Sequence, residues 1–206
     1  MNKINKKGFT LLELLIVIAI LGVLGSIVVF MLNPAETLKK ARDSQRISDL
    51  STIKTALGIY LTSTSSPQLS NTSGNTLCLG GGGTITAWSS FPVTATTTPT
   101  SDYGTFTSVV SVAQASSSLV DGTGWIPVNL TSLIGSSPIS GFPIDPINDN
   151  TDLIYRYACR KSPLGFEIDA SLESEAFTIV DDKRLKDGGN NNSRFEAGSD
   201  LKIIKI

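Results

Sequence analysis

The chain has 206 residues, a formal net charge of −1, two cysteines and no histidine. This length allows one domain of ordinary size with an appendage, but not two full domains. The absence of histidine excludes Ser-His-Asp and Cys-His catalytic sites and zinc sites built on imidazole. A charged fraction of 17% with almost no net charge also argues against a dedicated nucleic-acid binder, which needs a basic surface.

The first 62 residues and the rest of the chain differ in charge and hydropathy. The first part has a net charge of +4 and the remainder a net charge of −5. Between Phe9 and Ala35 only Glu13 is charged, and the 22 uncharged residues 14–35 follow it. As an α-helix these would be roughly 33 Å long, enough to cross the apolar core of a bilayer. Three lysines precede this run and predict a cytoplasmic N-terminus with an exported remainder: Lys3, Lys6 and Lys7.

Hydropathy alone leaves several interpretations of this segment open. A secretory signal would have a shorter apolar region, and Val23-Leu24-Gly25 is a poor cleavage site. A plain membrane anchor leaves Glu13 in a spanning helix, where a carboxylate costs about 2.5–3.5 kcal/mol at mid-bilayer and usually has a partner. Alternatively, Glu13 lies at the level of the lipid headgroups and needs no partner.

The order of residues at the start of the apolar run is more specific than its hydropathy. A basic leader ends in Gly8, and Phe9-Thr10-Leu11-Leu12-Glu13 comes next, before a long aliphatic stretch. Over about the first 30 residues this resembles the class III signal peptide of type IV pilins and pseudopilins. The resemblance implies that prepilin peptidase cleaves between Gly8 and Phe9 and methylates the new amino terminus of Phe9.

The resemblance also implies a role for Glu13. After cleavage Phe9 carries a cationic α-amine, and in a stack of parallel helices the Glu13 of one subunit can approach the amine of its neighbour. Each charge is costly alone in an apolar environment, and pairing offsets much of that cost. Because an unpaired register leaves both charges in hydrocarbon, we expect the pair to fix the register of assembly.

A second helical segment follows the apolar run. Asn33-Pro34-Ala35-Glu36 is typical of a helix start, although Pro34 could equally kink one continuous helix. Residues 36–61 predict an amphipathic helix. Its apolar positions are Leu38, Ala41, Ile47, Leu50, Ile53, Leu57 and Leu61, and the charged residues mostly on the opposite side are Lys39, Lys40, Arg42, Asp43, Arg46, Asp49 and Lys54.

Flexibility within the apolar helix is a further implication of the resemblance. Helices of this family loosen between a glycine and a proline in assembled fibres, and Gly22, Gly25 and Pro34 are the candidates here. Gly22 and Ser26, four residues apart, equally suit a close helix-packing contact.

Residues 63–206 predict a β-rich head. Strand-like patterns occupy 84–88, 108–112, 153–159 and 165–173, and a final pair is expected at 176–180 and 199–206. The segments FPIDP (142–146) and YRY (155–157) resemble the sheet of bacterial pilin heads. We therefore expect an α+β fold, in which a long N-terminal helix packs on a small antiparallel sheet. The expected divisions are a cleaved leader (1–8), a transmembrane and filament-core helix (9–35), an amphipathic helix (36–62) and the head (63–206).

Two features of the head bear on chemistry. Cys78 and Cys159 are both on the exported side, where an even pair favours a disulfide over two separately buried thiols. A major pseudopilin of type II secretion holds calcium in a C-terminal loop, and this chain has oxygen ligands in the corresponding region. The candidate calcium ligands are Asp182, Asp187, Asn190 and Asp200, and the alternative is a solvated turn.

Together these features predict a structural subunit of a type IV pilus or pilus-like filament, with no enzymatic activity and no nucleic-acid partner. The alternative is a minor pilin or pseudopilin of a secretion, adhesion or DNA-uptake apparatus. The resemblance implies as partners copies of the chain and related pilins, prepilin peptidase, an assembly platform protein and a motor ATPase. We expect a single-pass protein of the bacterial inner membrane with its head outside, later part of an extracellular pilus. No cofactor other than calcium is expected.

Overall fold

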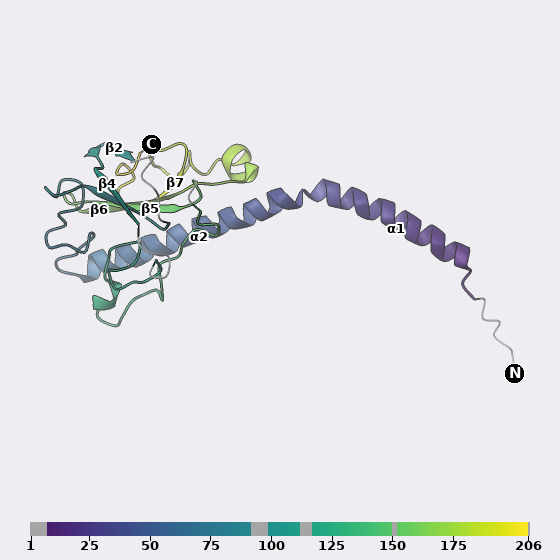
Figure 1. Cartoon of the computed structure of the whole chain (residues 1–206), viewed down its shortest axis with the longest axis horizontal. Helices are drawn as coiled ribbons and strands as arrows, with labels where there is room; N and C mark the ends of the chain where they lie inside the picture. Colours follow the sequence, from purple (N-terminus) through teal and green to yellow (C-terminus); the bar gives the residue numbers. More distant parts are fainter. Residues whose placement is uncertain (1–7, 92–98, 112–116, 150–151, 206) are drawn as a thin grey trace. The chain divides into compact units, whose positions relative to one another are not determined.

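The computed structural model describes residues 8–91, 99–111, 117–149 and 152–205 (Figure 1). The leader lysines at positions 3, 6 and 7 lie outside these residues. By its internal contacts the chain divides into two compact units, Met1–Lys39 and Lys40–Ile206. The first unit contains helix α1 (Leu11–Leu32) and the start of helix α2 (Pro34–Ser63), and the second contains the rest of α2 and every β-strand described.

The two helices are separated by Asn33. Its backbone adopts the left-handed conformation, with φ 37° and ψ 74°, and this ends α1. Pro34 then occupies the first position of α2, where its fixed φ is favourable and its missing N–H costs nothing. The side chain of Asn33 accepts a hydrogen bond from the backbone N–H of Glu36 at 3.4 Å. Asn33-Pro34 therefore starts a new helix rather than continuing the first.

The head contains a mixed five-stranded sheet in the order β4-β1-β5-β6-β7. A separate two-stranded ribbon pairs β2 with β3. The strands are β1 (Thr86–Ser89), β2 (Thr100–Ser101), β3 (Gly104–Thr105), β4 (Ser108–Ser111), β5 (Tyr155–Arg160), β6 (Gly165–Ala170) and β7 (Phe195–Gly198). A short 3-10 helix, η2 (Leu130–Ser132), lies between β4 and β5 in the chain. β1 and β4 pair in parallel, so the prediction of a wholly antiparallel sheet is wrong at this edge.

The predicted final strand pair is also wrong. Residues 176–180 form a π-helix, η3 (Ala176–Val180), and residues 199–205 contribute only a single bridge, between Lys205 and Thr100. The edge strand is instead β7. The sequence of η3 has high β-propensity, but that propensity reflects packing on a half-buried sheet surface. No described strand pairs with residues 176–180, and none of these residues is buried. The segment therefore lacks the sheet surface that would favour a strand.

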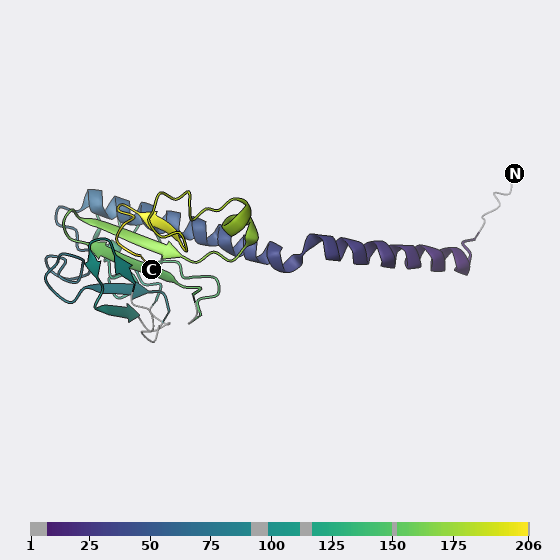
Figure 2. The same ribbon diagram turned by 90° about the horizontal axis from the view of Figure 1, so that it is seen from above.

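Helix α2 lies along one face of the sheet, and the main core is between them (Figures 1 and 2). Alternate residues of the central strands point into this core. They are Tyr155, Tyr157 and Cys159 of β5 and Phe166, Ile168 and Ala170 of β6, which pack with Leu50, Ile53, Leu57 and Tyr60 of α2. The predicted apolar stripe therefore covers the sheet from Leu50 onward, whereas Leu38 is exposed.

The opposite face of the sheet is covered by the C-terminal segment. Ile203 and Ile204 pack there with Ala87 and Ala158. This face also buries acidic side chains, because the alternate residues of β6 are Glu167 and Asp169. Burial alone would raise the pKa of Asp169, but the guanidinium groups of two arginines outweigh it and hold the pKa below its usual value. These arginines are Arg156 and Arg194, at 2.7 and 2.8 Å.

A buried ionic cluster fixes the N-terminal part of α2 to the head. Arg46 is 0% exposed and forms two hydrogen bonds with Asp145, at 2.6 and 2.9 Å. It also contacts Glu173 at 2.6 Å and Asp43 at 2.8 Å. Asp43 in turn accepts hydrogen bonds from the backbone N–H groups of Glu173 and Ser174. The placement of Asp43 and Arg46 on the solvent side is therefore wrong: both continue the buried stripe, as an ion network rather than as apolar packing.

The ionic cluster predicts that two neighbouring arginines, Arg46 and Arg42, contribute very differently to the free energy of unfolding. Replacing Arg46→Met leaves the carboxylates of Asp43 and Asp145 buried without their cation, and we expect a loss of about 3–5 kcal/mol in the free energy of unfolding. Arg42 also binds Glu173, but its side chain is 30% exposed and solvent screens the pair, so Arg42→Met should cost much less stability than Arg46→Met. Denaturant unfolding of the full chain in detergent measures both. Equal losses would contradict a specific role for the buried arginine.

The buried carboxyl of Glu167 predicts a dependence of stability on pH. Its Oε2 accepts hydrogen bonds from the backbone N–H groups of Ile203 and Ile204 at 2.7 and 3.0 Å. Burial raises the pKa of Glu167 far above its usual value, and the neighbouring carboxyl of Glu196, whose own pKa burial also raises, adds to the shift. The folded state therefore keeps a proton that the unfolded state loses above about pH 4.5. The free energy of unfolding should fall as pH rises above this value.

Glu167→Gln should weaken this dependence, because an amide is neutral at every pH and can still accept from the C-terminal segment, while Glu196 keeps a carboxyl whose pKa is also raised. Unfolding of the full chain in detergent across neutral and alkaline pH compares the variant with the parent. Glu173→Gln is a control of opposite sign: burial would raise the pKa of Glu173, but Arg42 and Arg46 lower it. Its stabilising charge is present above its unfolded pKa, so that variant should lose most stability at neutral pH. Parallel pH profiles for Glu167→Gln and the parent would contradict the assignment.

Candidate processing and assembly site

The peptide bond between Gly8 and Phe9 lies in a segment without regular secondary structure just before α1. The side chain of Phe9 is 79% exposed, and a Cβ placed on Gly8 would meet no atom within 4 Å. The surrounding chain therefore leaves room for a larger side chain at position 8. A requirement for glycine there would come from an enzyme that binds this segment, and the segment is accessible to one.

Thr10 and Glu13 form a reciprocal hydrogen-bonded cap at the start of α1. The Thr10 hydroxyl accepts from the backbone N–H of Glu13 at 3.3 Å. The Oε2 atom of Glu13 accepts from the backbone N–H of Thr10 at 2.9 Å and from its hydroxyl at 2.8 Å. This capping box satisfies backbone donors that the first helical turn leaves free. Thr10 was not singled out from the sequence, although Thr-x-x-Glu before an apolar run is the recognised signature of such a cap.

Only one oxygen of the Glu13 carboxylate takes part in this cap. Among the described residues, no hydrogen bond reaches Oε1. A carboxylate has acceptor sites on both oxygens, so Oε1 can bind a further cation without breaking the cap. The cap also holds the carboxylate beside residue 10, next to the residue whose amine cleavage would expose.

The surface of α1 is apolar on all sides. Leu11–Val28 is long and apolar enough to cross a membrane, and none of it is buried within the chain. Cβ atoms placed on Gly22 or Gly25 would meet nothing within 4 Å, and the helix continues through both. The hydroxyl of Ser26 is satisfied within the helix by the carbonyl of Val23 at 2.7 Å. Any steric requirement for small residues at positions 22 and 25 would therefore come from neighbouring molecules, and the predicted loosening of the helix at these glycines stays a prediction.

In the head, Cys78 and Cys159 are joined by a disulfide with a Cα–Cα distance of 4.8 Å. Both cysteines are fully buried in the main core. The backbone adds to the connection, because the N–H of Leu79 donates to the carbonyl of Cys159 at 2.9 Å. The bond joins the loop after α2 to the centre of the sheet and closes 81 residues of sequence.

The four candidate calcium ligands do not form a common ligand set. Asp182 binds Arg184, Asp200 binds Arg160, and Asn190 donates to Asp102. Asp187 accepts from the backbone N–H groups of Gly189 and Glu196. Within the described residues, no group of three or more acidic or cysteine side chains could hold a metal ion. Calcium binding in this loop stays a prediction without preformed geometry.

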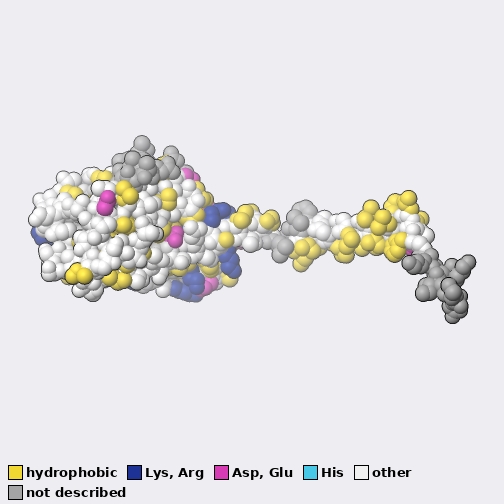
Figure 3. Space-filling model, turned by 90° about the horizontal axis from the view of Figure 1, so that it is seen from below, with side chains coloured by type: hydrophobic (Ala, Val, Ile, Leu, Met, Phe, Trp, Pro, Cys, Tyr) yellow, Lys and Arg dark blue, Asp and Glu magenta, His cyan; other side chains and the backbone are white. Residues whose placement is uncertain are grey.

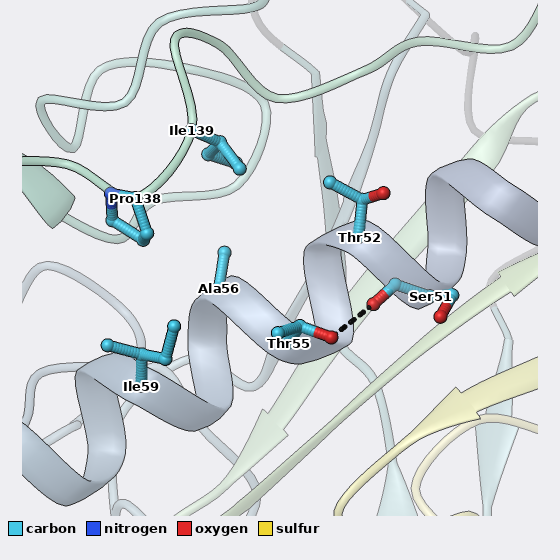
Figure 4. Close-up of a pocket in the computed structure, with 7 residues that line it drawn as sticks. All are labelled: Ser51, Thr52, Thr55, Ala56, Ile59, Pro138 and Ile139. Atoms are coloured by element: carbon cyan, nitrogen blue, oxygen red, sulfur yellow. Dashed lines mark hydrogen bonds between the residues drawn. The ribbon is translucent and has the colours of Figure 1, made fainter.

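A groove of about 290 Å³ lies between α2 and the segment containing Pro138 and Ile139 (Figure 4). On the helix it is lined by Ser51, Thr52, Thr55, Ala56 and Ile59. The hydroxyl of Thr55 is already bound to the carbonyl of Ser51 at 2.9 Å. The lining contains no titratable group, so this groove offers neither a general base nor an activated nucleophile.

Comparison with known families identifies the N-terminal segment. Residues 3–29 match the prokaryotic N-terminal methylation motif, which is the class III signal peptide of type IV pilins and pseudopilins. No curated protein and no solved structure matches the chain. The motif supports a pilin or pseudopilin, processed by prepilin peptidase and assembled with other pilins, and it belongs to a structural rather than an enzymatic family. Together with the α+β, pilin-like fold and the apolar helix, it fits membrane anchoring and a surface filament.

Proposed function

We propose that this carrier of the class III signal is a structural subunit of a type IV pilus or pilus-like filament, cleaved after Gly8 and polymerised through α1. The observation that carries the proposal is the motif at residues 3–29 together with an apolar helix of which Leu11–Val28 is not buried by any described part of the chain. An apolar helix of this length is stable only in lipid or against other apolar surfaces. Membrane insertion meets this need before assembly, and a bundle of identical helices meets it afterwards.

The transfer between these two states has a small hydrophobic driving force, because lipid chains are as apolar as the neighbouring helices. Extraction from the bilayer therefore needs work, and we assign it to a motor ATPase that acts through an assembly platform protein in the inner membrane. Packing and polar contacts must then select one arrangement of helices.

Glu13 supplies such a contact. Cleavage exposes the amine of Phe9, and the free Oε1 of a neighbouring Glu13 can bind it while Oε2 stays in the cap with Thr10. The buried pair then selects the register in which both charges are matched.

A substitution at Gly8 tests processing. Gly8→Ala should leave the precursor uncut, because a methyl group occupies the peptidase subsite, while the rest of the chain is unaffected by the added Cβ. Intact-mass measurement of the protein in cells with the peptidase reads out the loss of residues 1–8 and the methyl group on Phe9. Gly22→Ala has equally open surroundings and is the matched control, expected to be cut normally. Normal cutting at another position, or in cells without the peptidase, would refute the proposal.

Substitutions at Glu13 and Thr10 separate the charge from the cap. Glu13→Gln can still accept from Thr10 but carries no charge, so we expect membrane insertion with a severe loss of filaments, as for Glu13→Leu. Thr10→Val removes the hydroxyl of the cap and keeps the charge, so filament number should stay close to that of the parent. Electron microscopy of sheared filaments and membrane fractionation provide the two readouts. Filaments of normal number from Glu13→Gln would contradict the role of the ion pair.

A further inference from the structure

The head exposes a cluster of aliphatic side chains on η3 and the turn that follows it. Ile179 is 73% exposed, Val180 83% and Leu185 60%. Clustered exposed aliphatic residues on a folded domain mark a surface that another apolar medium covers. The rest of the segment is well ordered by hydrogen bonds, including those from Thr178 and Arg184. These three side chains are therefore displayed by a defined turn.

Lysines border these aliphatic residues. The ammonium groups of Lys40 and Lys183 lie 5.9 and 5.8 Å from the centre of the Phe177 ring. Lys183 and Lys186 share one carboxylate, that of Asp181. Figure 1 and Figure 2 show η3 beside the N-terminal half of α2, and Figure 3 shows Lys and Arg side chains gathered at one end of the head. Aliphatic residues flanked by lysines are typical of segments that lie in the interface of an anionic membrane.

We call this surface the lysine-flanked patch, and we define it by Lys40, Phe177, Ile179, Val180, Lys183, Leu185 and Lys186. Its electrostatics include the neighbouring acids. Asp182 is paired with Arg184 at 2.8 Å, and Asp181 is shared between two lysines. Lys183 and Lys186 share the carboxylate of Asp181, whereas Lys40 faces the Phe177 ring. Glu175, which precedes η3, and Glu36, one turn before Lys40 on α2, add two further acids near the lysines.

The length of the chain limits how far this patch can be from the bilayer. The span suited to crossing the membrane ends at Val28, and Lys40 comes twelve positions later. Twelve residues reach about 18 Å as a helix and no more than about 43 Å fully extended. Lys40 contacts Phe177, so the patch must stay within this reach of the membrane surface for as long as Leu11–Val28 is inserted.

We propose that the lysine-flanked patch contacts the anionic membrane surface while the subunit is still anchored, with Ile179, Val180 and Leu185 among the lipid headgroups. This inference rests on the membrane anchoring in the proposed function, but not on polymerisation. Its consequence is that the head is held on the bilayer before extraction, and that extraction must break two contacts with lipid instead of one.

Fluorescence of the full chain in vesicles tests the proposal. Val180→Trp and Ile134→Trp each add one Trp at an exposed aliphatic position, the second on the loop after η2 and outside the patch. The native Trp88 and Trp125 are buried and give the same background in both variants. The vesicles contain phosphatidylethanolamine and phosphatidylglycerol, with or without bromine on the acyl chains near the headgroup. We expect brominated lipid to remove most of the added fluorescence at position 180 and none of it at position 134.

A third variant makes the result specific to the patch. Adding Ile179→Asp and Leu185→Asp to Val180→Trp should abolish the quenching, because the introduced carboxylates oppose entry into an anionic interface. Replacing phosphatidylglycerol by phosphatidylcholine should weaken the quenching of Val180→Trp itself, because the lysines lose their lipid partners.

Flotation of the vesicles separates failure of this inference from failure of the proposed function. A chain that does not float with the vesicles is not anchored in them, and this result would contradict both the membrane contact and the proposed function. A chain that floats with equal or no quenching at positions 180 and 134 overturns the membrane contact alone. A blue shift at position 180 that depends on protein concentration, without quenching, would place a second copy on the patch and would also overturn it.

Discussion

Helix α1 is apolar, but the rest of the described chain does not bury it. The function that we propose depends on this constraint. Every described side chain of α1 is exposed, although the segment is almost entirely aliphatic. The head has its own core between α2 and the sheet, and the described residues of this core come from α2 and the head alone. The hydrophobic effect makes such a helix unstable in water, so the molecule is incomplete until lipid or other helices surround it. Membrane insertion and polymerisation are two solutions to the same deficit of burial.

The single carboxylate in this apolar region limits which of those solutions are stable. Thr10 stabilises Glu13 within the chain, and this lowers the cost of placing an acid at the end of an apolar helix. The cap uses one oxygen of the carboxylate, Oε2, and leaves Oε1 for the contact with a neighbouring subunit that we propose. In a plain membrane anchor Glu13 would only destabilise the inserted helix. In the proposed filament the cap reduces that destabilisation, and the charge of Glu13 can still favour one register of assembly over others.

Local patterns predicted much of this structure because they depend on neighbouring residues alone. The apolar helix, the start of α2 at Asn33-Pro34 and the paired strands β5 and β6 follow from periodicity and capping signals. The ionic cluster of Arg46 could not be predicted, because a charge at a buried helical position is indistinguishable from a solvated one until its partners are known. Those partners, Asp145 and Glu173, are 99 and 127 residues away in sequence.

The strand errors have the same origin. η3 has the composition of a strand, yet β7 and not η3 pairs with β6. β1 and β4 pair in parallel because of the path that the chain takes between them. The alternation of apolar and polar residues within each strand does not predict that path. Three of the four candidate calcium ligands, Asp182, Asp187 and Asp200, have oxygens that arginines or backbone N–H groups already bind, and local sequence does not show these partners. At the N-terminus the resemblance to the class III signal implies roles for Gly8, Phe9 and Glu13, and the Thr-x-x-Glu spacing was a local signal for the cap at Thr10 that the sequence reasoning missed.

The bond between Cys78 and Cys159 has a consequence for survival outside the cell. A protease that cuts the backbone once anywhere between these cysteines opens the loop but releases no fragment, because both halves stay covalently linked through the sulfur atoms. β1 and β4 lie inside that enclosed stretch and β5 contains its closing residue, so a nicked head can retain its sheet. A filament built from such heads would tolerate scattered damage without shedding pieces of its surface.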